Sequence, residues 1–152
     1  MSRAFVNEDA VVEDVLDRPI SAHPNYVTQT GLVTIEQALE AARHAHAAAQ
    51  LNGDRTELAK AASDLRYWSA RRATAQVVKP NPSRETVQFG STVIILRDGR
   101  KQAFQIVGED EANPSNGKIS YVSPLARAVM NLAVGDTTKF GESDLQIVGM
   151  LA

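Results

Sequence analysis

The chain has 152 residues, of which 43% are hydrophobic and 22% charged, with a formal net charge of −2 and no cysteine. This composition fits a soluble chain of one domain or two small ones. Without an excess of lysine and arginine, direct binding of DNA or RNA through the surface is disfavoured. The lack of cysteine excludes disulfides, thiolate catalysis and cysteine-ligated zinc, and it fits a reducing compartment. No apolar run approaches the roughly 20 residues of a membrane helix, and no signal peptide begins the chain, so we expect a cytoplasmic protein.

Residues 1–25 are predicted to form a flexible acidic arm. Five acids stand against two arginines, and Pro19 and Pro24 interrupt regular structure near the end of the segment. The acids are Glu8, Asp9, Glu13, Asp14 and Asp17.

Residues 26–78 predict an antiparallel coiled-coil hairpin. The segment 32–51 is rich in helix-forming residues and has no interior glycine or proline, and 58–75 follows after the turn "NGD". In both segments a stripe repeats at steps of three and four, so the two helices can pack together with the turn at their tip. The stripe consists of Leu32, Ile35, Leu39, Ala42, His46 and Ala49, then Leu58, Ala61, Leu65, Trp68, Arg72 and Ala75.

Two carboxylates, Asp54 and Glu57, stand three positions apart at this tip. The pattern is typical of a helix start, with Asp54 as N-cap and Glu57 reaching back as in a capping box. Acids in a first turn also suit the helix dipole. Capping leaves a second role open, because carboxylates at the end of a rod could enter a partner's cavity and contact a metal ion there.

Two prolines in residues 79–83 mark a linker, after which the composition changes to valine, isoleucine and glycine. Residues 84–152 predict a small antiparallel sheet with one short helix, so the fold class is α+β. Asp98 and Gly99 are expected to form a hairpin turn, and Pro124 suits the first turn of the helix. The expected strands are 86–97, 101–110, 118–123, 137–140 and 144–151, and the helix is 124–130.

The remaining candidate sites favour structural interpretations. His44 and His46 are two apart and point to different sides of a helix, which does not suit metal ligands. The acids of "GEDE", residues 108–111, lack the ligand spacing of a calcium loop and fit a solvated turn. No serine–histidine–aspartate order, phosphate-binding glycine loop or metal-protease motif is present. We expect no cofactor and no metal site of the protein's own.

The segment from Val87 to Asp136 resembles the C-terminal domain of the Gre transcript-cleavage factors of bacterial RNA polymerase. The motifs "FGSTV", "QIVGEDEA", "ISYVSPLARA" and "VGD" occur in the family's order and near its spacing. Further back, "YVTQTGL" resembles the entry into the family's first helix, "GDRTE" its acidic tip and "DLRYWSARRATAQVV" the end of its second helix. About 125 residues are covered, counted from residue 26 onward, so the acidic arm lies outside the resemblance.

This resemblance implies an FKBP-like C-terminal domain that docks on the polymerase rim, and a coiled-coil finger in the polymerase secondary channel. Family members rescue backtracked polymerase, because their tip acids help to hold the polymerase's second magnesium while the polymerase cuts its own RNA. Asp54 and Glu57 fall on the two tip acids, and Ser123 with Pro124 fall on the "SP" of the rim-contacting loop. The implied partner is core RNA polymerase, and we expect a monomer without independent DNA binding.

Two departures bear on the catalytic role. After Glu57 the family usually has asparagine, alanine, an acid and an aromatic residue, whereas this chain has "LAKAAS". Each helix is also shorter than the family pattern by about eight to ten residues, so at about 1.5 Å per residue the finger ends about 12 to 15 Å early. Metal coordination does not tolerate such a gap. Val122 precedes "SP" where some members have an acid, which would alter the rim contact.

Three hypotheses follow. The first is a Gre-family elongation regulator that occupies the secondary channel with a shortened finger and is not itself an enzyme. The second is an active cleavage factor that brings its tip acids to the metal in a different docking pose. The third is a peptidyl-prolyl isomerase, for which an aromatic-lined pocket would have to come from Phe89, Phe104, Tyr121 and Phe140.

Overall fold

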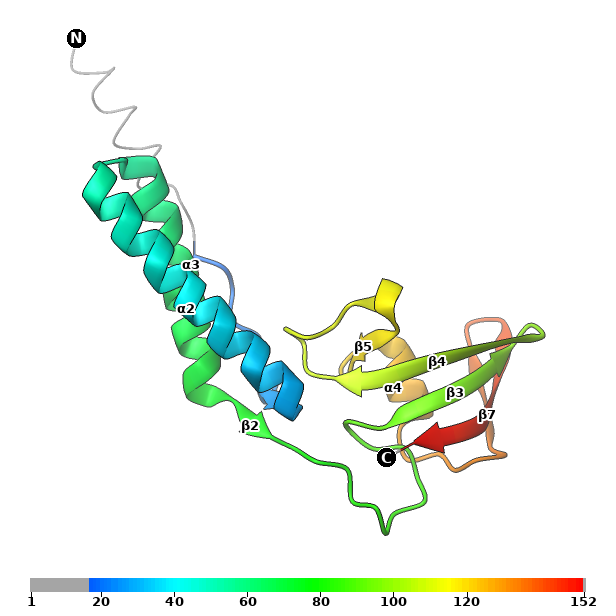
Figure 1. The fold of residues 1–152 in the computed structure, drawn as a ribbon. Helices are drawn as coiled ribbons and strands as arrows, with labels where there is room; N and C mark the ends of the chain where they lie inside the picture. The colour runs from blue at the N-terminus through cyan, green and yellow to red at the C-terminus, as the bar shows by residue number, and fades with distance from the viewer. Residues whose placement is uncertain (1–16, 152) are drawn as a thin grey trace. The chain divides into compact units, whose positions relative to one another are not determined.

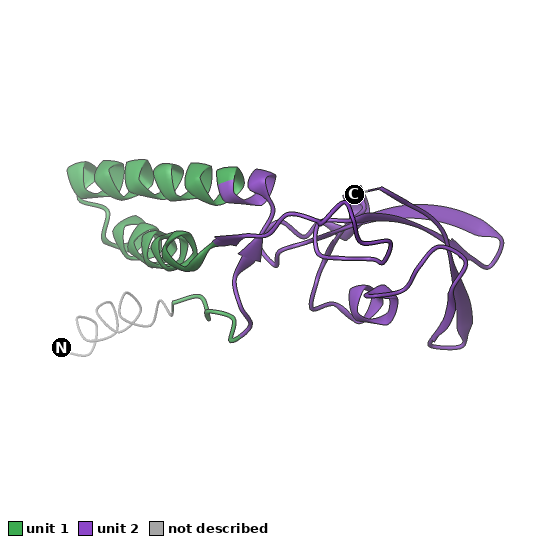
Figure 2. Cartoon of the chain, turned by 90° about the horizontal axis from the view of Figure 1, so that it is seen from below, with its two compact units in different colours: residues 1–22, 33–75 green, residues 23–32, 76–152 purple. Residues whose placement is uncertain are grey.

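The computed structural model describes residues 17–151, so most of the predicted acidic arm lies outside the described residues. The chain divides into two compact units (Figure 2). One contains residues 1–22 and 33–75, and the other contains residues 23–32 and 76–152. The sheet unit thus includes the segment that leads into the first helix. The domain boundaries expected at residues 25, 78 and 83 remain predictions.

Two long helices form the hairpin, α2 at Gln29–Asn52 and α3 at Arg55–Thr74 (Figure 1). At about 1.5 Å per residue, their 24 and 20 residues span about 36 and 30 Å. Thr28 caps α2, because its hydroxyl accepts the Gly31 N–H at 2.9 Å. Within residues 17–151, no helix is long and apolar enough to cross a membrane.

The predicted stripe on α2 is the buried face of that helix. Ile35, Leu39, Ala42 and Ala49 are all buried at steps of three, four and seven. On α3 the agreement is weaker toward the base, where Arg72 is exposed and pairs with Glu36 at 3.2 Å. The neighbouring Arg71 is buried instead, at 2% exposure. The three–four pattern therefore predicts the buried face of α2. On α3 it predicts Arg72 as the buried arginine, whereas the buried one is Arg71.

The sheet unit contains a five-stranded sheet in the order β5–β4–β3–β7–β6 and a two-stranded ladder of β1 with β2 (Figure 1). The α+β class is confirmed. The sheet is mixed, however, because β4 and β5 pair in parallel, and so do β1 and β2. The strands are β1 Tyr26–Val27, β2 Gln76–Val77, β3 Thr92–Arg97, β4 Arg100–Val107, β5 Lys118–Ser120, β6 Thr137–Phe140 and β7 Ser143–Leu151.

The β3–β4 hairpin forms through the predicted Asp-Gly turn. Asp98 and Gly99 have φ values of 51° and 76°, the left-handed pair that a two-residue turn requires. The strand expected from residue 86 begins only at Thr92. Gly90 has φ +88°, and Ser91 Oγ accepts the Gln88 N–H at 3.0 Å, so the chain turns before the strand starts.

The core of the sheet unit lies between the sheet and helix α4, Pro124–Val129. Alternate residues of β3 and β7 point inward, as the period of two in a strand requires. Tyr26, Phe89 and Tyr121 form an aromatic cluster with ring centroids 5.4 to 6.1 Å apart. The buried members of the core are Val87, Phe89, Val93, Ile95, Ile106, Ile119, Ala126, Val129, Leu145 and Ile147.

Candidate functional site

The tip of the hairpin is a tight turn at Asn52, Gly53 and Asp54. Gly53 has φ +67°, a conformation that glycine adopts without strain. Asp54 is in an extended conformation, and its Oδ1 accepts the Glu57 N–H at 3.1 Å. Asp54 is thus the N-cap of α3, as the sequence predicts, and Glu57 lies in the first turn of the helix.

Both tip acids are exposed to solvent. The capping bond engages Oδ1 of Asp54, one of two carboxylate oxygens. Leu51, just before the turn, is 89% exposed. Among residues 17–151 there is no group of three or more metal-ligating side chains. Since Mg²⁺ takes six ligands in near-ideal octahedral geometry, a metal at this tip would need most of its ligands from a partner or from water.

The two histidines of α2 do not come together as metal ligands. His44 is exposed and lies 3.3 Å from the Glu40 carboxylate, one turn earlier. His46 is half-buried on the stripe that faces α3.

The second candidate site is the start of α4. Ser123 is the N-cap, and its Oγ accepts the Ala126 N–H at 3.3 Å. Pro124 follows at the first helical position and is exposed. Because the Ser123 cap holds the first turn of α4 in place, Pro124 has a fixed position at the surface. The tip acids and this pair belong to different units of the chain.

The "GEDE" segment is a turn, but Glu111 does not face solvent. Its side chain is 6% exposed, and its Oε1 accepts the Thr28 hydroxyl at 2.6 Å. Its Oε2 lies 3.3 Å from Lys118 Nζ. Glu111 therefore ties the entry of α2 to the sheet, and the solvated interpretation is wrong for this residue. No local pattern indicates this burial, because the partners of Glu111 are 83 and 7 positions away in the chain.

The contacts of Asp17 and Arg18 with α3 were also not predicted from the sequence. Asp17 forms a bidentate pair with Arg66, and the Arg18 guanidinium lies 3.8 Å above the ring of Tyr67. The hydrogen bond from Arg66 holds the pKa of Asp17 below its ordinary value, with Coulombic attraction and a bond from Ser63 adding to the effect. The sequence shows only an acid and a cation in a proline-containing arm, a pattern that carries no pairing information.

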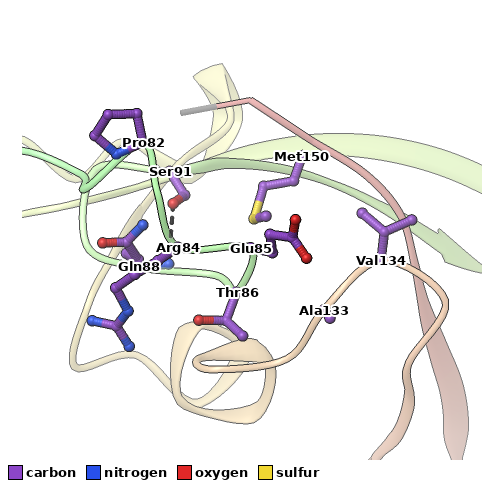
Figure 3. Close-up of a pocket in the computed structure, with 9 residues that line it drawn as sticks. All are labelled: Pro82, Arg84, Glu85, Thr86, Gln88, Ser91, Ala133, Val134 and Met150. Carbon is purple, nitrogen blue, oxygen red and sulfur yellow. Dashed lines mark hydrogen bonds between the residues drawn. The ribbon is translucent and has the colours of Figure 1, made fainter.

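A cavity of about 420 Å³ opens in the sheet unit (Figure 3). Its lining includes no aromatic residue, and Phe89 and Tyr121 are taken up by the core instead. Its lining does not fit the aromatic proline pocket that an isomerase would need. The lining residues are Pro82, Arg84, Glu85, Thr86, Gln88, Ser91, Ala133, Val134 and Met150.

Comparisons with known proteins show what the sheet unit is similar to. Residues 81–147 match the family model "Transcription elongation factor, GreA/GreB, C-term". The chain is 39% identical over 104 residues to transcription elongation factor GreA of Maricaulis maris, covering 60% of this chain and 66% of that protein. It is also 39% identical over 93 residues to GreB of Neisseria meningitidis, covering 57% of each. Residues 81–147 of this chain are thus similar to the C-terminal part of the GreA/GreB family.

In both relatives the match spans less than two thirds of the relative's own length. Two solved structures are also similar. GreA factor homolog 1 (Gfh1) of Thermus thermophilus has a TM-score of 0.40 at 22% identity, covering 86% of this chain and all of that one. A GreA/GreB factor of Nitrosomonas europaea has a TM-score of 0.42 at 23% identity, covering 84% and 98%. The similarity to the GreA/GreB family rests on the sequence matches.

Proposed function

We propose that this protein is an RNA polymerase-binding regulator of transcription elongation. The match to transcription elongation factors supports a role in elongation. The helical hairpin and the sheet domain that the resemblance implies are both present in this chain. The sheet unit is the docking part in this proposal, with Ser123 and Pro124 at the contact. The hairpin enters the secondary channel.

The observation that carries the non-catalytic half of the proposal is the length of the hairpin. Helix α3 has 20 residues from the tip to its end, or about 30 Å. Against the family pattern this finger stops about 12 to 15 Å short, so Asp54 and Glu57 would not reach the polymerase magnesium. A finger of this length occupies the channel and excludes other factors from it.

The second candidate is an active cleavage factor, and the exposed tip favours it. Asp54 and Glu57 are held in a defined first turn and are free of burial, as acids that contact a metal in trans would be. This function requires a docking pose that carries the tip further into the channel. An isomerase activity has no supporting feature in the cavity described above.

Gel filtration with purified bacterial core polymerase tests the shared part of both candidates. We expect the protein to elute with the polymerase, and Pro124→Glu to weaken binding by about tenfold, as loss of a central contact does. Lys101→Glu, an exposed substitution on β4, is the control and should leave binding unchanged. Failure of the unaltered protein to elute with the polymerase would exclude both candidates.

A further inference from the structure

The cavity of the sheet unit has the size of a ligand site. Its volume is about 420 Å³, and pockets that hold small ligands have volumes of about 300 to 1,000 Å³. All its lining residues fall between Pro82 and Met150, inside the sheet unit. Neither the tip acids nor Ser123 and Pro124 line it. The docking contacts of the proposed function therefore leave this cavity free.

The loop that lines the cavity is held in place by its own hydrogen bonds. Gln88 Oε1 accepts the Asn81 N–H, and Gln88 Nε2 donates to the Asn81 carbonyl, both at 2.9 Å. Ser91 is 1% exposed, and its Oγ accepts the Gln88 N–H at 3.0 Å. Thr86 pairs with Ala133 in an isolated antiparallel bridge, which ties the loop to the segment after α4. Because the loop is already ordered, a ligand would lose little free energy in fixing it.

One side of the cavity combines a carboxylate with aliphatic surface. In Figure 3 the Glu85 carboxylate points toward Met150 and Val134, which line the same cavity. Val134 is 55% exposed, so a ligand can reach this side from solvent. Glu85 is also exposed, and within residues 17–151 it has no ion-pair partner. This side suits a ligand with a cation at one end and an apolar stem behind it.

The neighbouring Arg84 does not neutralise this carboxylate. Its Nη2 donates to Asn131 Oδ1 at 3.4 Å, and in Figure 3 its guanidinium points away from the Glu85 carboxylate. The lining includes no glycine and no residue of a helix's first turn, so it lacks the N–H groups that cradle a phosphate. The cavity therefore favours a cationic ligand over an anionic one.

The lining also distinguishes between kinds of cation. None of the nine lining residues is aromatic. Quaternary ammonium groups are held by aromatic cages, and guanidinium groups stack on aromatic faces. Lysine needs neither, because its four-carbon stem packs on aliphatic surface while its ammonium reaches a polar partner.

We propose that this cavity binds a lysine side chain that a partner protein inserts from its surface. The stem of the lysine lies against Met150 and Val134, and its ammonium donates to the Glu85 carboxylate. The site is a second contact surface on the sheet unit, apart from Ser123 and Pro124. It does not depend on the proposed role in transcription.

A titration of the full chain followed by nuclear magnetic resonance tests the site without polymerase. The probe is Nα-acetyl-lysine methylamide, and Nα-acetyl-norleucine methylamide, which has the same stem without the ammonium, is the comparison. We expect the lysine probe at millimolar concentrations to shift the backbone amides of Thr86 and Val134 and the methyl group of Met150. The methyl group of Met130, which packs against the core, should not shift. The norleucine probe should bind about two to five times more weakly, as loss of an exposed ion pair does.

Glu85→Gln tests the role of the carboxylate. It should lower the affinity for the lysine probe to that for the norleucine probe. Glu142→Gln is the matched control, because it makes the same change at an exposed acid between β6 and β7, and it should leave both affinities unchanged. A lysine probe that shifts none of the cavity signals would overturn the proposal. So would equal binding of the two probes, or a Glu85→Gln variant that binds the lysine probe as the unaltered protein does.

Discussion

Asp54 has two chemical roles available at the hairpin tip, and one of them is visible. Its Oδ1 accepts the Glu57 N–H and so satisfies one of the N–H groups that a helix start leaves open. This role needs an oxygen acceptor but no charge. Contact with a metal in a partner needs the charge. The two roles can therefore be separated by substitution.

Replacing Asp54 separates them. Asp54→Ala should lower the free energy of unfolding by about 1 kcal/mol through loss of the cap, whereas Asp54→Asn should change it by only a few tenths. Urea denaturation followed by circular dichroism measures both. Equal destabilisation by the two variants would mean that the carboxylate charge, and not the cap, stabilises the tip.

The contact between Asp17 and Arg66 should depend on pH in one direction. The pKa of Asp17 is lowered from its ordinary value of 3.8. The ion pair therefore stabilises the contact of Asp17 with α3 fully above that value. Its contribution is lost as the pH falls through the lower pKa of the folded protein. We expect the fluorescence of Trp68, the single tryptophan, to change below about pH 3.8, while circular dichroism reports any unfolding separately.

Asp17→Asn is the control for this titration. It should show the acid form of the fluorescence at neutral pH and no acid transition of its own. A transition of unchanged amplitude in this variant would assign the signal to another group.

Single residues show where sequence reasoning succeeds. Asp54 was identified as a helix start because a cap depends on a neighbour three positions away. Glu111 and Asp17 were not identified, since their partners Thr28 and Arg66 are 83 and 49 positions distant. The conflict between cap and catalytic acid at Asp54 also cannot be resolved from spacing, because both roles require the same residues.

At the scale of elements, the hairpin was predictable and the edge of the sheet was not. The stripe from Ile35 to Ala49 is a local pattern that only a helix satisfies, and the Asp98–Gly99 turn is a strong local signal. The parallel pairing of β5 with β4 depends instead on the path of the connection between Val107 and Lys118, which no local pattern specifies. The six residues before Thr92 have strand-like composition. They are not part of β3, because the chain turns at Gly90 and at the hydrogen bond between Gln88 and Ser91.

The junction of β1 with the end of β4 allows a prediction about elements. A Cβ added to Gly108 would stand 2.3 Å from the Tyr26 carbonyl oxygen, so the backbone of β1 would have to move. Gly108→Ala should lower the free energy of unfolding by about 1 to 3 kcal/mol, as overpacking does. Urea denaturation measures the loss.

Gly149→Ala is the comparison within the same sheet unit. Its Cβ would meet the flexible end of Ile94 at 3.1 Å, so we expect a smaller loss than for Gly108→Ala. The account of this junction is wrong if the two alanines cost the same.

At the scale of the whole molecule, the sequence match and the length of the hairpin bear differently on whether the protein stimulates RNA cleavage. The match over residues 81–147 is to transcription elongation factors, and Asp54 and Glu57 lie exposed at the hairpin tip. Under the proposed function, the 20 residues of α3 place these acids short of the polymerase metal. A protein that docks like its relatives but does not reach the metal should compete with them rather than act like them.

Transcript cleavage on backtracked polymerase complexes tests this claim most directly. The protein is added alone and then in increasing amounts with a cleavage-competent GreA. We predict no RNA shortening by the protein alone and a dose-dependent loss of GreA-stimulated cleavage. RNA shortening by the protein alone that disappears in the Asp54→Ala, Glu57→Ala double variant would contradict the claim and establish an active cleavage factor.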